Sequence, residues 1–184
     1  MHKFKEIYYY IDNFNRKELI NICLKKKINL IYRNYNKEQN FNQLNKLRAF
    51  CKNYLLKLYI ANDIKLAIKL KANGLYIPSF NKKKKFFNLS NKKFKIIGSA
   101  HNVQEVKNKI AQGCSSVILG PIFKTQKSNH FLDVVKFNLI CSQNETNIIS
   151  LGGINEKNFK RLLITKSNGF ASISWIKKNG LNKI

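Results

Sequence analysis

Residues 95–127 read KIIGSAHNVQEVKNKIAQGCSSVILGPIFKTQK. A short β-branched run at residues 96–97 is followed by Gly-Ser, and a second apolar run at residues 117–119 is followed by Gly-Pro. Between the two runs, apolar residues recur at helical spacing from 103 to 110, which predicts one amphipathic helix. A strand, a helix and a strand joined by short connections form a βαβ unit, and its two strands are parallel.

The same alternation extends over the whole chain. Strands are expected at residues 7–11, 28–33, 56–60, 75–77, 96–97, 116–119, 148–151 and 169–173. Helices are expected at residues 16–26, 38–53, 64–72, 103–112, 132–141 and 156–165, whereas residues 79–93 and 175–184 are polar or poorly periodic. This pattern predicts an α/β fold: a single domain over residues 1–184 that forms a short (β/α)8 TIM barrel with reduced fourth and eighth helices. The rival fold, an open flavodoxin-like sheet, leaves the last repeats unexplained.

The composition is strongly basic, with 35 Lys and Arg against 9 Asp and Glu and a formal net charge of +26. One interpretation is binding to nucleic acid or another polyanion. The other is biased coding, because Asn, Ile and Phe are abundant together with Lys, and the lysines are spread along the chain. Arginine supplies most specific base contacts and is scarce here, so nucleic acid is not an expected partner.

The apolar runs and the cysteines of the sequence bear on the protein's compartment and on its redox state. No apolar run approaches the roughly 18–20 residues of a membrane span, and the first residues carry no signal-peptide segment, so a cytoplasmic location without membrane contact is expected. The four cysteines have no metal-ligand spacing, which favours buried free thiols.

Residues that follow the strands of a parallel barrel share one mouth. Here they are Asp12, Arg33, Asn62, Asp63, Ser79, Ser99, His101, Thr125, Lys127, Gly152, Gly153 and Ser174. The set is rich in hydroxyls, amides, bases and glycines and poor in carboxylates, which favours the binding of phosphorylated small molecules. The glycines and the serine after the last two strands lie where many barrels bind phosphate, although glycines also serve simply to permit tight turns.

Two of these residues have two candidate roles each, and the two roles of Asp63 are compatible with each other. Asp63 can cap the helix that follows it, and it can also bind Mg²⁺ together with substrate phosphates. His101 can act as a general acid or base, or it can hold its turn through a hydrogen bond.

Five segments resemble motifs of the thiamine phosphate synthase/TenI family, in the same order and each at a strand end. They are YIANDIKLAIKLKANGLYI from residue 59, IIGSAHN from residue 96, VILGPIFKT from residue 117, ISLGGIN from residue 149 and NGFASISWI from residue 168. The resemblance implies a barrel transferase that couples hydroxymethylpyrimidine diphosphate with thiazole phosphate, giving thiamine phosphate and diphosphate. It further implies Mg²⁺ as the cofactor, and the family analogy allows a homo-oligomer.

The resemblance also assigns roles residue by residue. Three residues are expected to take part in catalysis: Arg33, Ser99 and Lys127. Six are expected to bind the two substrates: Asn62, Thr125, Gly152, Gly153, Ile173 and Ser174. Asp63 is expected to bind Mg²⁺.

The half of the site assigned to the diphosphate departs from the family pattern. Ile31 and Tyr35 stand where the family's second-strand motif has polar residues, and Tyr76 stands where the family has a histidine. Asn81 lies near the position of the family's second Mg²⁺-binding aspartate, which this chain lacks. Two functions therefore stay open: a divergent thiamine phosphate synthase, and a non-catalytic or regulatory TenI-like protein that binds thiazole phosphate or thiamine phosphate.

Overall fold

The eight expected strands are all present and close into one barrel. The computed structural model describes residues 4–23, 28–35, 40–83, 86, 89, 94–126, 128–179 and 181. Each strand pairs in parallel with the next, and the last pairs with the first. The strands are β1 (Glu6–Ile11), β2 (Asn29–Tyr32), β3 (Lys57–Ala61), β4 (Gly74–Ile77), β5 (Lys95–Ala100), β6 (Ser116–Leu119), β7 (Asn147–Leu151) and β8 (Gly169–Ala171). The (β/α)8 barrel is thus confirmed.

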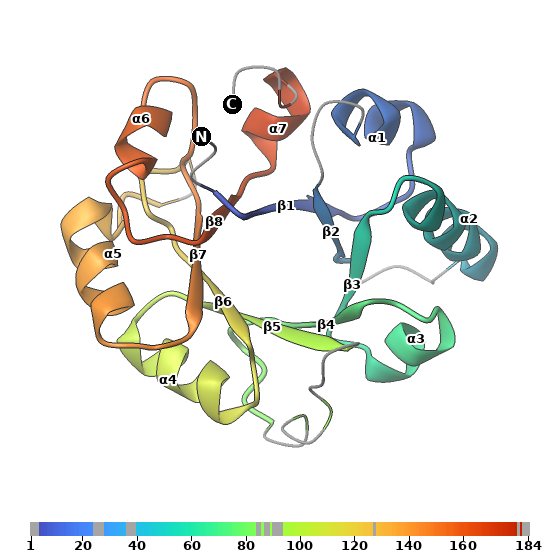
Figure 1. Ribbon diagram of the computed structural model, residues 1–184, viewed down its shortest axis with the longest axis horizontal. Coiled ribbons are helices and arrows are strands. Elements are labelled where there is room, and N and C mark those ends of the chain that lie inside the picture. The colour runs from blue at the N-terminus through green and yellow to red at the C-terminus, as the bar shows by residue number, and fades with distance from the viewer. Residues whose placement is uncertain are drawn as a thin grey trace.

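Helices surround this ring of strands on its outside, as Figure 1 shows. They are α1 (Arg16–Cys23), α2 (Phe41–Asn53), α3 (Ile64–Lys69), α4 (Val103–Ala111), α5 (Asp133–Ser142), α6 (Phe159–Leu162) and α7 (Ser174–Asn179). Much of residues 79–93, the place of the reduced fourth helix, lies outside the described residues, and those that are described there form no α-helix. In the described part of the chain, no helix is long and apolar enough to cross a bilayer.

The helix after β7 is shorter than predicted. The sequence predicts a helix over residues 156–165, but α6 has only four residues. Just before α6, Asn155 and Asn158 form two reciprocal hydrogen bonds. The backbone N–H of each residue donates to the side-chain Oδ1 of the other, at 2.9 and 3.2 Å. At the other end, the Thr165 hydroxyl donates to the carbonyl of Leu162 at 2.7 Å. These side chains bond to backbone N–H and carbonyl groups that would form main-chain hydrogen bonds in a longer helix.

Two further boundaries differ from the prediction. The Gly-Ser pair expected to end the fifth strand lies inside β5, where Gly98 pairs with Val117 of β6. The eighth strand is expected to reach residue 173 and an irregular tail to start at 175, but β8 ends at Ala171 and α7 begins at Ser174. The carbonyl of Ile173 accepts from the N–H of Lys177 at 3.0 Å, so it already belongs to the first helical turn.

Side chains alternate between the two faces of the barrel wall, as the period of two in a strand requires. The interior cluster consists of Tyr8, Tyr10, Ile31, Tyr59, Ala61, Tyr76, Ile97, Ile118, Ile149 and Ala171. The alternate residues pack outward against the helices in a second cluster. Moving two residues further along a strand from Ile31 or Ile97 reaches Arg33 or Ser99. The interior therefore places these polar side chains at the C-terminal mouth.

All four cysteines are free, two of them buried and two half-buried, which confirms the expected free thiols. Burial raises the pKa of Cys23, Cys51, Cys114 and Cys141 to about 12. Because the thiolate is the reactive form, we expect iodoacetamide at pH 8 to label the native protein at least about 100-fold more slowly than the urea-unfolded chain. The rate should rise about tenfold per pH unit towards that pKa. Mass spectrometry measures both, and rapid labelling of any one thiol would contradict the burial.

Candidate functional site

One side of the barrel mouth is built from an arginine and two tyrosines, Tyr10 and Tyr76, whose rings meet edge to face. Arg33 follows β2, and its guanidinium carbon lies 4.9 Å from the centroid of the Tyr10 ring. The hydroxyl oxygens of Tyr10 and Tyr76 are 3.4 Å apart. Burial raises the pKa of Tyr10 well above its ordinary value, Tyr76 and Tyr35 raise it further, and Arg33 opposes them. The Tyr10 hydroxyl therefore stays protonated, and it donates its hydrogen bond to the hydroxyl of Tyr76.

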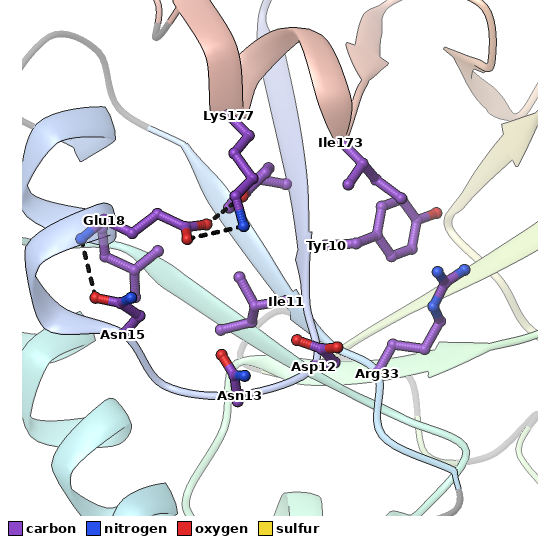
Figure 2. Close-up of a pocket in the computed structure, with 11 residues that line it drawn as sticks. Tyr10, Ile11, Asp12, Asn13, Asn15, Glu18, Arg33, Ile173 and Lys177 are labelled. Atoms are coloured by element: carbon purple, nitrogen blue, oxygen red, sulfur yellow. Dashed lines mark hydrogen bonds and ion pairs between the residues drawn. The ribbon is translucent and has the colours of Figure 1, made fainter.

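A cavity of about 390 Å³ opens beside this group, between the ends of β1, β2 and β8 and the helices α1 and α7. Figure 2 shows Arg33, Asp12 and Ile173 around Tyr10 on one side of it. On the other side, Lys177 Nζ lies 3.1 Å from Glu18 Oε2, which joins α7 to α1. The cavity thus combines cationic and anionic side chains next to the barrel mouth.

The ends of β3 and β4 bring one carboxylate and two amides together. Asp63 Oδ1 accepts from the N–H of Leu66 at 2.9 Å and so caps α3, which confirms its structural role. Asn62 precedes it with a φ of 59°, and its Oδ1 accepts from Nδ2 of Asn81 at 2.6 Å. The second oxygen of the Asp63 carboxylate takes no part in this bond.

This donor set fits Mg²⁺ only in cooperation with a substrate. Mg²⁺ is commonly held by one or two carboxylates, by phosphate oxygens and by water. Among the described residues, no group of three or more His, Cys, Asp or Glu side chains could hold a metal ion by itself. Asp63 would supply the single carboxylate, the amide oxygens would lie close by, and the phosphates of the substrate would complete the shell.

The opposite side of the mouth is made of backbone. Gly152 and Gly153 follow β7 with φ values of 94° and 69°. The N–H of Phe123 donates to the carbonyl of Gly152 at 3.2 Å, so the loop after β6 packs directly on this turn. Thr125 lies in the same loop, where its Oγ1 accepts from the N–H of Ser128 at 3.1 Å. A Cβ built at Gly152 would lie 3.7 Å from Cγ2 of Thr125, so Thr125 lies next to the turn after β7.

β5 supplies the residues between these two sides. Ser99 is buried and lies opposite Ile118 in the register of β5 and β6. His101 is exposed, and its Nδ1 lies 2.6 Å from the carbonyl oxygen of Gly120, so Nδ1 carries the proton and donates. This bond ties the end of β5 to the start of the loop after β6, which supports the positioning role for His101.

The last two predicted residues face different hollows. Ile173 lines the cavity beside Arg33, whereas Ser174 lines a more open hollow of about 760 Å³ with Ile154 and Asn155 of the turn after β7. Lys127 lies outside the described residues. Every predicted site residue that the structure describes is at the C-terminal end of the barrel.

Sequence reasoning missed Tyr10 as a residue of the mouth, and it named Asn81 without its contact to Asn62. The signal for Tyr10 is present in the chain, because a period of two from Tyr8 aims both rings into the barrel. Asn81 carries no such signal, because its contact with Asn62 depends on how the loop after β4 folds back.

Comparisons with known proteins place the chain in a family. The family profile described as thiamine monophosphate synthase matches residues 10–176. The chain is 30% identical over 175 residues to the thiamine-phosphate synthase of Pelagibacter ubique, covering 88% of this chain and 81% of that protein. It is also 30% identical over 139 residues to the thiamine-phosphate synthase of Staphylococcus saprophyticus, covering 73% of this chain and 65% of the relative.

A solved structure agrees at the level of the fold. Thiamine phosphate pyrophosphorylase from Pyrococcus furiosus superposes with a TM-score of 0.77 at 16% identity, covering 94% of this chain and 87% of that one. With a matching profile over most of its length, the chain belongs to the thiamine monophosphate synthase family.

Proposed function

We propose that the protein is a thiamine-phosphate synthase, which couples hydroxymethylpyrimidine diphosphate to thiazole phosphate and releases diphosphate. Family membership supports this reaction. The observation that carries it is that the candidate phosphate-binding groups lie on two separate sides of the mouth. Arg33 and Asp63 lie on the side of β2 and β3, and the turn at Gly152 and Gly153 lies on the side of β7.

On the first side, the chain's own groups would hold the leaving diphosphate. Contact with the Tyr10 ring orients the Arg33 guanidinium, which can donate to diphosphate oxygens. Mg²⁺, bound by Asp63 and the substrate, would neutralise part of the diphosphate charge. In the reaction the C–O bond of the pyrimidine methylene breaks, its electron pair leaves with diphosphate, and the thiazole nitrogen forms the new C–N bond.

On the second side, the thiazole phosphate would be fixed by backbone and hydroxyl donors. The N–H of Gly153 and the hydroxyls of Thr125 and Ser174 are the expected contacts. The apolar side chain of Ile173 lines the cavity beside Arg33 and would limit the access of water from that cavity to the reacting carbon. Both substrates would then meet above Ser99 at the end of β5.

A specific feature favours the second candidate, a relative that binds thiazole phosphate without coupling it. Ile31 is buried in the barrel interior, and the ring centroids of Tyr35 and Phe80 lie 5.7 Å apart. The family has polar groups in this part of the site. The diphosphate side is therefore more apolar than the family pattern, while the Gly152-Gly153 side keeps its form.

A coupling assay decides between the two candidates. Purified protein is mixed with both substrates and Mg²⁺, and thiamine phosphate is followed by chromatography. We expect steady product formation that stops when EDTA is added and resumes with excess Mg²⁺. Absence of product from a protein that binds thiazole phosphate in calorimetry would instead establish the binding function.

We also propose a cytoplasmic location, and the family analogy allows a homo-oligomer. Sedimentation equilibrium at several protein concentrations measures the oligomeric state directly.

A further inference from the structure

A lysine is buried on the outside of the barrel, under α4. Lys109 is 2% exposed, although lysine is among the residues least often buried. Its Nζ donates to the carbonyls of Pro78 and Asn81, each at 2.7 Å, and to Oε1 of Gln112 at 2.9 Å. An ammonium group has three N–H donors, so all of them are used, and all three acceptors are neutral.

The barrel wall is shaped to let this side chain pass. Gly98 lies on the outer face of β5, and a Cβ there would be 2.8 Å from Cγ and Cδ of Lys109 and 2.9 Å from the sulfur of Cys114. Contacts under 3.0 Å between carbon atoms are not tolerated without movement. The absence of a side chain at Gly98 therefore opens the path along which Lys109 crosses β5.

Gln112, just after α4, completes a clamp on the loop after β4. It is 1% exposed, and its Nε2 donates to the carbonyls of Asn81 at 2.9 Å and Lys83 at 2.8 Å. Lys109 and Gln112 thus bind the carbonyls of residues 78, 81 and 83 between them, and the carbonyl of Asn81 receives two bonds.

The clamped residue is also the one that reaches the mouth. While its carbonyl is held by α4, the Asn81 side chain donates to Asn62 at 2.6 Å and accepts from the N–H of Lys83 at 2.9 Å. Asn62 adjoins Asp63, the proposed Mg²⁺ ligand. One residue therefore connects a buried cation outside the barrel to the proposed diphosphate side inside the mouth.

We propose that Lys109 is a positioning residue for the diphosphate side of the site, with Gln112 as its partner. It fixes residues 78–83 so that Asn81 meets Asn62 beside Asp63, and it does not contact substrate. The assignment of this side to the diphosphate rests on the proposed function. The clamp itself is a property of the substrate-free protein and can be measured without turnover.

The test compares Lys109→Met with Lys107→Met. Methionine keeps the length of the buried side chain without its donors, and Lys107 is exposed on the same helix. In hydrogen–deuterium exchange of the substrate-free proteins, Lys109→Met should exchange at least about tenfold faster within residues 78–83, and Lys107→Met should match the wild type. A peptide over β7 should be unchanged in both.

Kinetics separate positioning from general damage. For Lys109→Met we expect KM for the pyrimidine diphosphate to rise at least about tenfold, and KM for thiazole phosphate to change less than about twofold. Equal losses for both substrates, or unchanged exchange in residues 78–83, would overturn the proposal. Should Lys109→Met not fold, Gln112→Leu removes two of the loop's bonds and must give the same pattern. If the wild type does not couple the substrates, the proposed function fails while the exchange result still decides the clamp.

Discussion

Asp63→Asn is expected to slow thiamine phosphate formation at least about 100-fold while leaving the melting temperature nearly unchanged. Asparagine caps a helix about as well as aspartate, so the bond from the N–H of Leu66 to the side chain at position 63 survives. What disappears is the negative charge, the only carboxylate in the proposed Mg²⁺ donor set. The variant thus separates the two roles that the sequence leaves open.

Two comparison variants complete this experiment. Asp63→Ala should lose the activity and also about 1 kcal/mol of unfolding free energy, because the cap is lost as well. Asn40→Ala removes a similar cap, the bond from the N–H of Gln43 to Asn40 Oδ1 that starts α2, and should lower stability without the loss of rate. Rates are measured over a Mg²⁺ titration, and Mn²⁺ binding is followed by electron paramagnetic resonance. An Asp63→Asn protein that retains its rate and its metal affinity would show that the carboxylate only caps α3.

The order of the strands could be predicted from the sequence because a closed parallel barrel leaves a strong local signal. Each strand is a short run of apolar residues buried on both faces, as in residues 117–119, and each ends in turn-forming or polar residues. Residues after different strands converge on one mouth by topology alone. Knowing the strands was therefore enough to place Arg33, Asp63 and Gly153 at the same end of the molecule.

The contacts that hold the loops around the mouth could not be predicted, because they depend on bonds between distant segments. Lys109 lies 31 and 28 residues from the two backbone carbonyls that it binds. Every residue has a backbone carbonyl, so the residue types at positions 78 and 81 do not reveal these bonds. Local signals also misled in places. Gly98 resembles the end of a strand but serves inside β5 to make room for that lysine. The exchange of bonds between Asn155 and Asn158 shortens α6 against its apolar periodicity.

Gly153→Ala is expected to destabilise the protein by about 2–4 kcal/mol and to weaken thiazole phosphate binding at least about tenfold. Gly153 has a φ of 69°, a conformation that costs alanine about 1 kcal/mol or more. A Cβ there would also lie 2.4 Å from the carbonyl oxygen of Phe123 and 2.5 Å from that of Lys124. Since both atoms are backbone, the turn after β7 and the loop after β6 would have to separate.

The matched control is Gly113→Ala, which has a similar backbone strain at the other end of the barrel. Gly113 has a φ of 85° in the turn between α4 and β6, so alanine there should cost about 1–2 kcal/mol and leave the affinity for thiazole phosphate unchanged. Urea denaturation gives the free energies, and calorimetry gives the affinities at a temperature where both variants are folded. If Gly153→Ala loses stability but binds thiazole phosphate as tightly as Gly113→Ala does, the turn only joins β7 to α6 and the phosphate lies elsewhere in the mouth. A loss of affinity in Gly153→Ala alone would place the phosphate on the side of β7. Separation of the turn after β7 from the loop after β6 would displace the Gly153 N–H and Thr125 together.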